Sequence, residues 1–189
     1  MAKTQISRIG YSQVEPNHLS GIVTGQILAQ LPVDTTTMGD IIENGRFAKY
    51  DYATGKVNLT GPGEWMLIYN EIQNYDERKQ GLKDFAMIKS NYTDNEIVPR
   101  LISTVLGDVY TTNAFGGAAT SNTATVNGIA VEVGDTLAVT TATGYLGLVA
   151  TGQGADNSAL DMNGPIFQVV KVYTMPDSQQ KGVKLMRIE

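Results

Sequence analysis

The residues that could do chemistry are few and widely separated. His18 is the only histidine and the chain contains no cysteine, so thiolate nucleophiles, cysteine-based metal sites and disulfides are excluded. A Ser-His-Asp triad or a histidine-rich metal site would have to be built around that one histidine, in an irregular part of the chain. We therefore interpret His18 as a contact or turn residue and expect no catalytic residue and no bound metal.

Paired carboxylates are the remaining route to catalysis, because glycoside hydrolysis needs only two acids held about 5–10 Å apart. Aromatic residues make up 7% of the chain, and no row of Trp or Tyr indicates a sugar platform. A small hydrolase or carbohydrate-binding module therefore stays the less favoured alternative. Its candidate acids are those nearest the single tryptophan: Glu64, Glu71, Asp76 and Glu77.

The loop from residue 151 to residue 164 fits neither of two familiar ligand motifs. Gly152-Gln153-Gly154 lacks the third spaced glycine of a dinucleotide fingerprint and opens no helix. Asp156 and Asp161 do not have the spacing of an EF-hand. We expect no cofactor, and the sequence gives no support for a loosely held cation.

Charge and hydropathy argue against nucleic acid and membrane partners. The net charge is −5, and no Lys or Arg lies between Arg100 and Lys171, whereas phosphate binding needs clustered basic side chains. No run approaches the roughly twenty apolar residues that a bilayer crossing needs. The N-terminal residues also lack the apolar core of a signal peptide.

The elements that would position these residues are short strands separated by turns. The chain has 20 glycines and only 17% charged residues, which is typical of turn-rich β proteins. Between Asn44 and Lys89, the β-prone runs Arg46–Tyr52 and Val57–Thr60 flank a glycine-containing turn, and the Trp-containing run Glu64–Ile72 follows. We predict a Trp-centred antiparallel meander as the core.

Strand and turn signals continue to the C-terminus. Asn127-Gly128 is the strongest hairpin signal, and Pro165–Met175 and Lys181–Glu189 read as the last strands. Leu106-Gly107-Asp108 and Val133-Gly134-Asp135 each place a Gly-Asp turn before a strand, as Asn44-Gly45 and Thr143-Gly144 place a Gly turn. Such echoes arise more often by convergence on turn chemistry than by duplication. They support a barrel or sandwich of similar hairpins.

Residues 1–39 differ from the rest and are predicted to form an extended N-terminal arm, with residues 40–189 forming the β-barrel or sandwich domain. Their apolar residues follow no sustained period, and Pro16 and Pro32 discourage a continuous helix. The sequence allows a short helical turn around Gly25–Leu31. The arm is expected to lie on its own barrel or on a neighbouring protein. The predicted partner contacts are Ile6, Ile9, Tyr11, Val14, His18, Leu19, Ile22, Ile27, Leu28 and Leu31.

The pattern of residues 39–189 resembles the head decoration, or capsid cement, proteins of tailed bacteriophages. The likeness rests on the segment Asn44–Asp51, then Gly55–Leu59, then an apolar strand, and on Val133–Val139 followed by Gly144–Val149 and the returning strand Phe167–Val172. The resemblance implies an all-β, antiparallel, β-tulip-like barrel or sandwich without enzyme activity.

The same resemblance implies a function and a place in the cell. The chain would be made in the host bacterial cytoplasm and would lie on the capsid exterior of the virion, where it bridges subunits of the major capsid protein. A homo-oligomer such as a trimer is a family-level expectation. The first alternative is a phage tail or head-fibre-base component.

Overall fold

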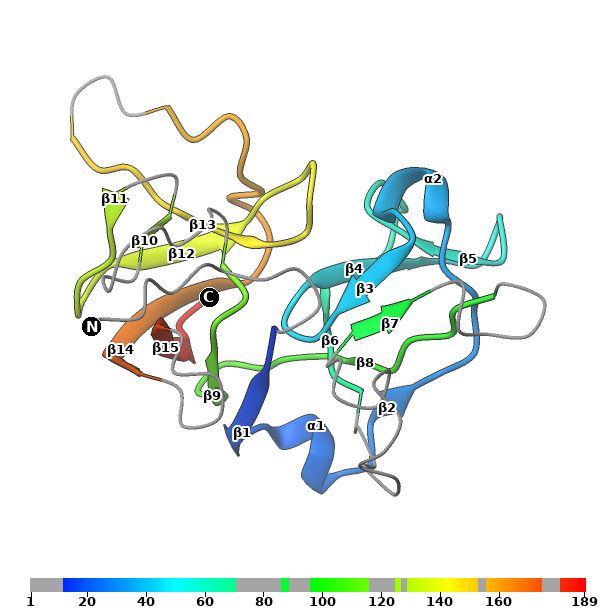
Figure 1. Cartoon of the computed structure of the whole chain (residues 1–189), viewed down its shortest axis with the longest axis horizontal. Helices are drawn as coiled ribbons and strands as arrows, with labels where there is room; N and C mark the ends of the chain where they lie inside the picture. The colour runs from blue at the N-terminus through cyan, green and yellow to red at the C-terminus, as the bar shows by residue number, and fades with distance from the viewer. Residues whose placement is uncertain are drawn as a thin grey trace, which may run out of the picture.

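The computed structural model describes residues 12–70, 86–88, 96–115, 125–126, 129–152, 156–174 and 181–189. These residues form an all-β protein whose two large sheets occupy two halves of the molecule (Figure 1). Its only described helices are single turns, α1 (Ser20–Val23) and α2 (Thr35–Met38), and neither is long or apolar enough to span a bilayer.

The larger sheet has six strands, and every neighbouring pair in it is antiparallel. At its centre the last two strands form a long hairpin, which confirms the two C-terminal strands predicted from the sequence. The order is β1 (Val14–His18), β9 (Val109–Thr112), β15 (Lys181–Arg187), β14 (Ile166–Thr174), β12 (Thr136–Val139) and β13 (Leu146–Leu148).

The second large sheet has five strands in the order β2 (Ile27–Leu28), β8 (Leu101–Ile102), β6 (Met66–Ile68), β4 (Phe47–Asp51) and β5 (Lys56–Asn58). Trp65 is buried beside β6, as predicted. The predicted meander is wrong in its order, because β6 pairs with β4 rather than with β5. Asn58 accepts hydrogen bonds from the N–H groups of Thr60 and Gly61, and this turn directs the chain back across β4.

Two small two-stranded sheets complete the described structure. β3 (Ile41–Glu43) pairs with β7 (Ala86–Ile88), and β10 (Thr125–Val126) pairs with β11 (Ile129–Ala130). The second pair confirms the predicted hairpin, whose Asn127-Gly128 turn lies outside the described residues. The helical turn proposed around Gly25–Leu31 is wrong, since that stretch contains β2.

One hydrophobic core joins the two sheets. Phe47 of β4 and Phe167 of β14 have ring centroids 5.5 Å apart, and Tyr110 of β9 packs edge-on against Phe167 at 5.6 Å. All three side chains are fully buried. The all-β, antiparallel prediction is therefore confirmed, whereas neither large sheet closes into a barrel within the described residues.

Residues 12 to 39 contribute to both sheets. β1 is an edge strand of the six-stranded sheet, and β2 is an edge strand of the five-stranded sheet. Val33 forms a parallel bridge with Val57. The described part of the predicted arm thus lies on its own chain, which is one of the two placements that the sequence allows.

Candidate functional site

Gly144 brings the two halves of the molecule into backbone contact. Gly45 precedes β4 and Gly144 lies between β12 and β13, with φ of 88° and 72°. The Phe47 N–H donates to the Gly144 carbonyl at 2.7 Å, and a Cβ on Gly144 would overlap the Phe47 carbonyl oxygen. We call this contact, residues 43–49 and Trp65 against residues 143–145 and Asp161, the seam.

Arg46 is the most extensively bonded side chain of the seam. It is only 6% exposed, and its guanidinium donates to the Met38 carbonyl at 3.0 Å and the Ile41 carbonyl at 3.2 Å. It also reaches across to the Thr143 carbonyl, at 3.1 Å from Nε and 2.8 Å from Nη2. A buried cation is stable here because each bond is charge-assisted.

Glu43 and Tyr145 form a second polar contact in the seam. The Tyr145 hydroxyl donates to the buried Glu43 carboxylate, and the Arg46 guanidinium lies 5.0 Å from the centroid of the Tyr145 ring. Burial, followed by the neighbouring charge of Glu43, raises the pKa of Tyr145. The phenol therefore stays protonated at neutral pH and is a poor base.

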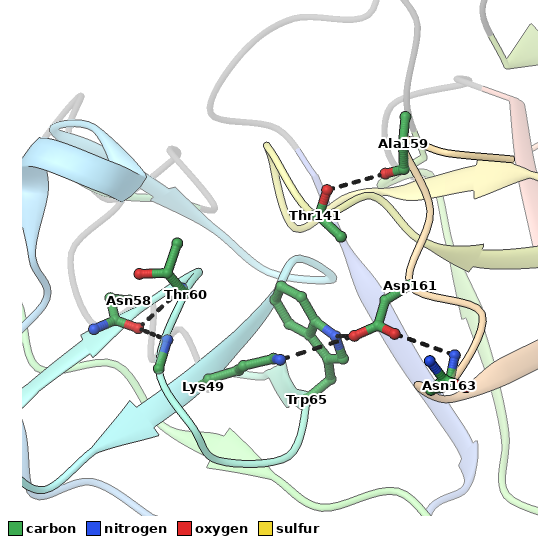
Figure 2. Close-up of polar contacts among 9 residues, drawn as sticks. Lys49, Asn58, Thr60, Trp65, Thr141, Ala159, Asp161 and Asn163 are labelled. Carbon is green, nitrogen blue, oxygen red and sulfur yellow. Dashed lines mark hydrogen bonds and ion pairs between the residues drawn. The ribbon is translucent and has the colours of Figure 1, made fainter.

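Lys49, Trp65 and Asp161 form the third contact, which joins β4 and β6 to the loop before β14. Figure 2 shows Lys49 and Trp65 directed at Asp161 from the opposite half. The Trp65 indole N–H donates to Asp161 Oδ2 at 2.8 Å, and Lys49 Nζ lies 3.8 Å from the same oxygen. The hydrogen bond from Trp65 is the main cause of a lowered pKa of Asp161.

The seam's polar groups are bound to other parts of the protein itself. Arg46 binds backbone carbonyls, Tyr145 binds Glu43, and Asp161 binds Trp65. The described residues contain no group of three or more His, Asp or Glu placed to hold a metal ion. What this arrangement does is fix the two halves of the molecule against each other.

Tyr110 and Tyr145 make a matched pair for a test of these contacts. The Tyr110 hydroxyl is fully buried and has no hydrogen-bond partner in the described part of the chain, whereas the Tyr145 hydroxyl is bound to Glu43. We expect Tyr110→Phe to raise the free energy of unfolding by about 1 kcal/mol, because it removes an unpaired buried hydroxyl, and Tyr145→Phe to lower it by about 1 kcal/mol. Urea denaturation at neutral pH measures both.

Tyr110→Phe should also differ from the wild type in its stability at alkaline pH. Burial raises the pKa of Tyr110 above its value in the unfolded chain, where tyrosine ionises near pH ~10. The folded state then binds the proton more tightly, so its stability is fully present below that pH and is lost as the pH rises further. Above that pH, Tyr110→Phe should lose less stability than the wild type. An equal loss in both proteins would contradict a raised pKa of the buried Tyr110 hydroxyl.

Among the residues that the structure describes, the sequence-predicted chemical residues are not brought together. His18 is exposed on β1, and Glu64 is exposed and accepts a hydrogen bond from the Ser103 hydroxyl at 2.9 Å. Asp156 accepts a hydrogen bond from the Ser158 N–H, and Asp161 belongs to the seam. Glu71, Asp76 and Glu77 lie outside the described residues.

The predicted partner contacts fall into three groups. Leu19 is buried in the chain's own core, and Val14, Ile22, Leu28 and Leu31 are partly buried against that core. Ile27 is half-buried in β2, and His18 is exposed. Partner contact through this set stays a prediction, and Ile6, Ile9 and Tyr11 lie outside the described residues.

Two turns with one geometry precede β9 and β12. In the β9 turn, residues 105–108, Asp108 Oδ2 accepts the Val105 N–H at 3.0 Å. In the β12 turn, residues 132–135, Asp135 Oδ2 accepts the Glu132 N–H at 2.8 Å. The glycine before each aspartate has a positive φ, 86° and 98°. The Gly-Asp echo in the sequence therefore marks a real structural repeat.

Both turns are also anchored in the same way to the central hairpin. In each, the glycine N–H donates to a strand carbonyl, and that strand residue's N–H donates back to the aspartate carbonyl, at 2.8 to 2.9 Å. The strand residue is Arg187 of β15 for the β9 turn and Val169 of β14 for the β12 turn. Four backbone bonds thus fix the two turns to neighbouring strands.

The two turns are related by a local two-fold axis normal to the six-stranded sheet. Val109, Met186, Gln168 and Thr136 form one cross-strand row. From β9 through β15 and β14 to β12, each strand is antiparallel to the next. β9 and β12 therefore run in opposite directions from this row. The axis therefore passes between Gln168 and Met186.

The two turns and their anchor strands also carry exposed apolar side chains at corresponding sequence positions. Leu106 and Val133 are the residues before the two glycines and are 68% and 65% exposed. Ile188 and Val170, which follow the two anchor residues, are each 43% exposed. We call Leu106 with Ile188, and Val133 with Val170, the paired patches.

The fold and these sites define an all-β protein with two open antiparallel sheets, a polar seam between them and two matching apolar patches on one sheet. Comparison of the chain with protein-family models, with curated proteins and with solved structures found no match.

Proposed function

We propose that this chain is a non-enzymatic structural protein of a tailed bacteriophage, which lies on the capsid exterior and bridges subunits of the major capsid protein. The paired patches carry the proposal, since a protein that joins two copies of one partner needs two matching contact surfaces. The resemblance to capsid decoration proteins, with their β-tulip-like folds, points to the same partner.

The exposure of the paired patches supports a contact role. Turn positions that face solvent are usually polar, yet both turns carry a large apolar residue at the equivalent position. Rigid anchoring of each turn lowers the conformational entropy that binding would cost. The patches are therefore exposed, preorganised apolar surfaces suited to contact with another protein.

Bridging follows from the energetics of two weak contacts. Burying a Val, Leu or Ile side chain contributes about 1.5–3 kcal/mol, so one patch alone would bind weakly. On an assembled shell the second patch meets a neighbouring subunit at high effective concentration, which strengthens binding without a new kind of contact. A ligand that prefers the assembled state also stabilises it.

The direct test compares assembled shells with dissociated capsid subunits. The purified chain should co-sediment with shells about 100-fold more tightly than it binds free subunits. Leu106→Asp or Val133→Asp should reduce shell binding to near the level of free subunits. The control is Ile129→Asp, which alters an exposed apolar residue of β11 outside both the patches and the arm and should leave binding unchanged.

Equal affinity for shells and free subunits would contradict bridging, and no affinity for either would contradict the capsid role. Binding to isolated tails instead would support the tail or fibre-base alternative. Hydrolysis or retention of glycans in a screen would support the hydrolase or carbohydrate-binding alternative. Sedimentation of the free chain would show whether it forms the predicted homo-oligomer.

A further inference from the structure

Asn-Gly pairs are sites of spontaneous asparagine deamidation in proteins. This chain has such pairs at Asn44, Asn127 and Asn163. The glycine amide nitrogen attacks the asparagine side-chain carbonyl carbon, a C–N bond forms, and ammonia leaves with the closing of a succinimide ring. Water then opens the ring at either carbonyl to give aspartate or isoaspartate. Glycine favours the step because it has no side chain and adopts many backbone conformations.

Asn44 is held away from this reaction. It is buried, and its side-chain amide donates to the Asn70 carbonyl at 3.2 Å while its oxygen accepts the Asn70 N–H at 2.7 Å. The attacking group is occupied as well, because the Gly45 N–H donates to the Ile68 carbonyl at 2.9 Å. Ring closure here would break all three bonds.

Asn163 is in the opposite situation. It is exposed, and in the part of the chain that the structure describes its side-chain amide makes no hydrogen bond. Its backbone N–H donates to Asp161 Oδ1 at 3.1 Å (Figure 2). The Gly164 N–H makes a long bond of 3.2 Å to the Asp161 carbonyl. We propose that Asn163-Gly164 is a modification site, where the folded protein converts asparagine to isoaspartate and aspartate.

The position of this site couples the change to the seam. Gly164 packs against Trp65, so that an added Cβ would lie 2.8 Å from the indole Cδ1. Isoaspartate inserts a methylene into the main chain beside this contact, and either product adds a carboxylate two residues from Asp161. Both changes disturb the Trp65 hydrogen bond to Asp161, and Trp65 is the only tryptophan, so its fluorescence reports the event.

The test is incubation of the full chain in mildly alkaline buffer, followed by peptide mapping and isoaspartyl methyltransferase labelling. Trypsin would leave Asn127 and Asn163 on one fragment, since no Lys or Arg lies between Arg100 and Lys171. A protease that cleaves before aspartate separates them. The Asn163 peptide should convert at least about tenfold faster than the Asn44 peptide, and in urea the two rates should become similar because both side chains are then free.

Asn163→Ser keeps the backbone N–H that binds Asp161 and cannot form the ring. Its Trp65 fluorescence should stay constant under the same incubation, whereas that of the wild type should drift with the extent of conversion. Conversion of Asn163 as slow as that of Asn44 in the folded protein would overturn the proposal. A fluorescence drift in Asn163→Ser equal to that of the wild type would overturn its coupling to the seam.

Discussion

Gly144→Ala is expected to lower the free energy of unfolding by about 3 kcal/mol or more, because two costs coincide. The residue has a φ of 72°, a left-handed conformation that costs an L-residue about 1–2 kcal/mol. The new Cβ would also overlap the Phe47 carbonyl, and such overpacking typically costs about 1–3 kcal/mol. The seam would have to separate to make room, with loss of the Phe47 to Gly144 hydrogen bond.

Gly55→Ala is the matched control. Gly55 has nearly the same φ, 66°, and has no atom within 4 Å of an added Cβ. It should therefore show only the backbone cost, about 1–2 kcal/mol. Chemical denaturation of both variants gives the contribution of the seam by difference, and equal destabilisation would show that the contact at Gly144 contributes nothing.

Arg46→Met should be the most damaging substitution of a polar side chain in the described structure, at about 3 kcal/mol or more. Methionine fills similar space but leaves the carbonyls of Met38, Ile41 and Thr143 without their donor. Each net hydrogen bond to a charged group contributes about 1.5–3 kcal/mol. Native proteins are stable by only about 5–15 kcal/mol, so a large fraction of the molecules could unfold at physiological temperature.

Arg46→Lys should recover only part of this loss, since an ammonium lacks the planar fork that reaches carbonyls on both sides of the seam. Arg100→Met is the control, because Arg100 is exposed and its hydrogen bonds in the described structure are made by its backbone, to Asn70 and Tyr69. It should change stability by less than about 0.5 kcal/mol. Full rescue by lysine would show that charge alone, and not the geometry of the fork, stabilises the seam.

Local features of the fold could be predicted from the sequence. The turn at Gly55, the β10–β11 pairing and the C-terminal hairpin each depend on turn residues and β-prone runs that are neighbours in the chain. The meander was wrong because strand order depends on where the chain goes after a turn. That path is set by the bonds of Asn58 and by long-range packing, which residue types alone do not reveal.

The seam could not be predicted, because its partners are far apart in sequence. Arg46 and Thr143 are separated by 97 positions, and Trp65 and Asp161 by 96. The paired Gly turns at Gly45 and Gly144 gave the one usable signal. The pattern marks them as entries to strands, and it does not indicate that Gly144 lies against Phe47.

The sequence indicates the turns of the paired patches but not their spatial relation. The Gly-Asp echo marked both turns, and the structure shows that their hydrogen bonds agree. The two-fold relation arises only when β9 and β12 take their places on either side of the central hairpin. The exposed fractions of Leu106 and Val133 likewise depend on tertiary structure.

Electron microscopy of the intact phage particle tests the central claim most directly. We predict density for this two-sheet fold on the outer surface of the capsid, across the joint between two major capsid subunits, with Leu106 against one subunit and Val133 against the other. Density confined to a single subunit, or with both patches facing solvent, would contradict the bridging account.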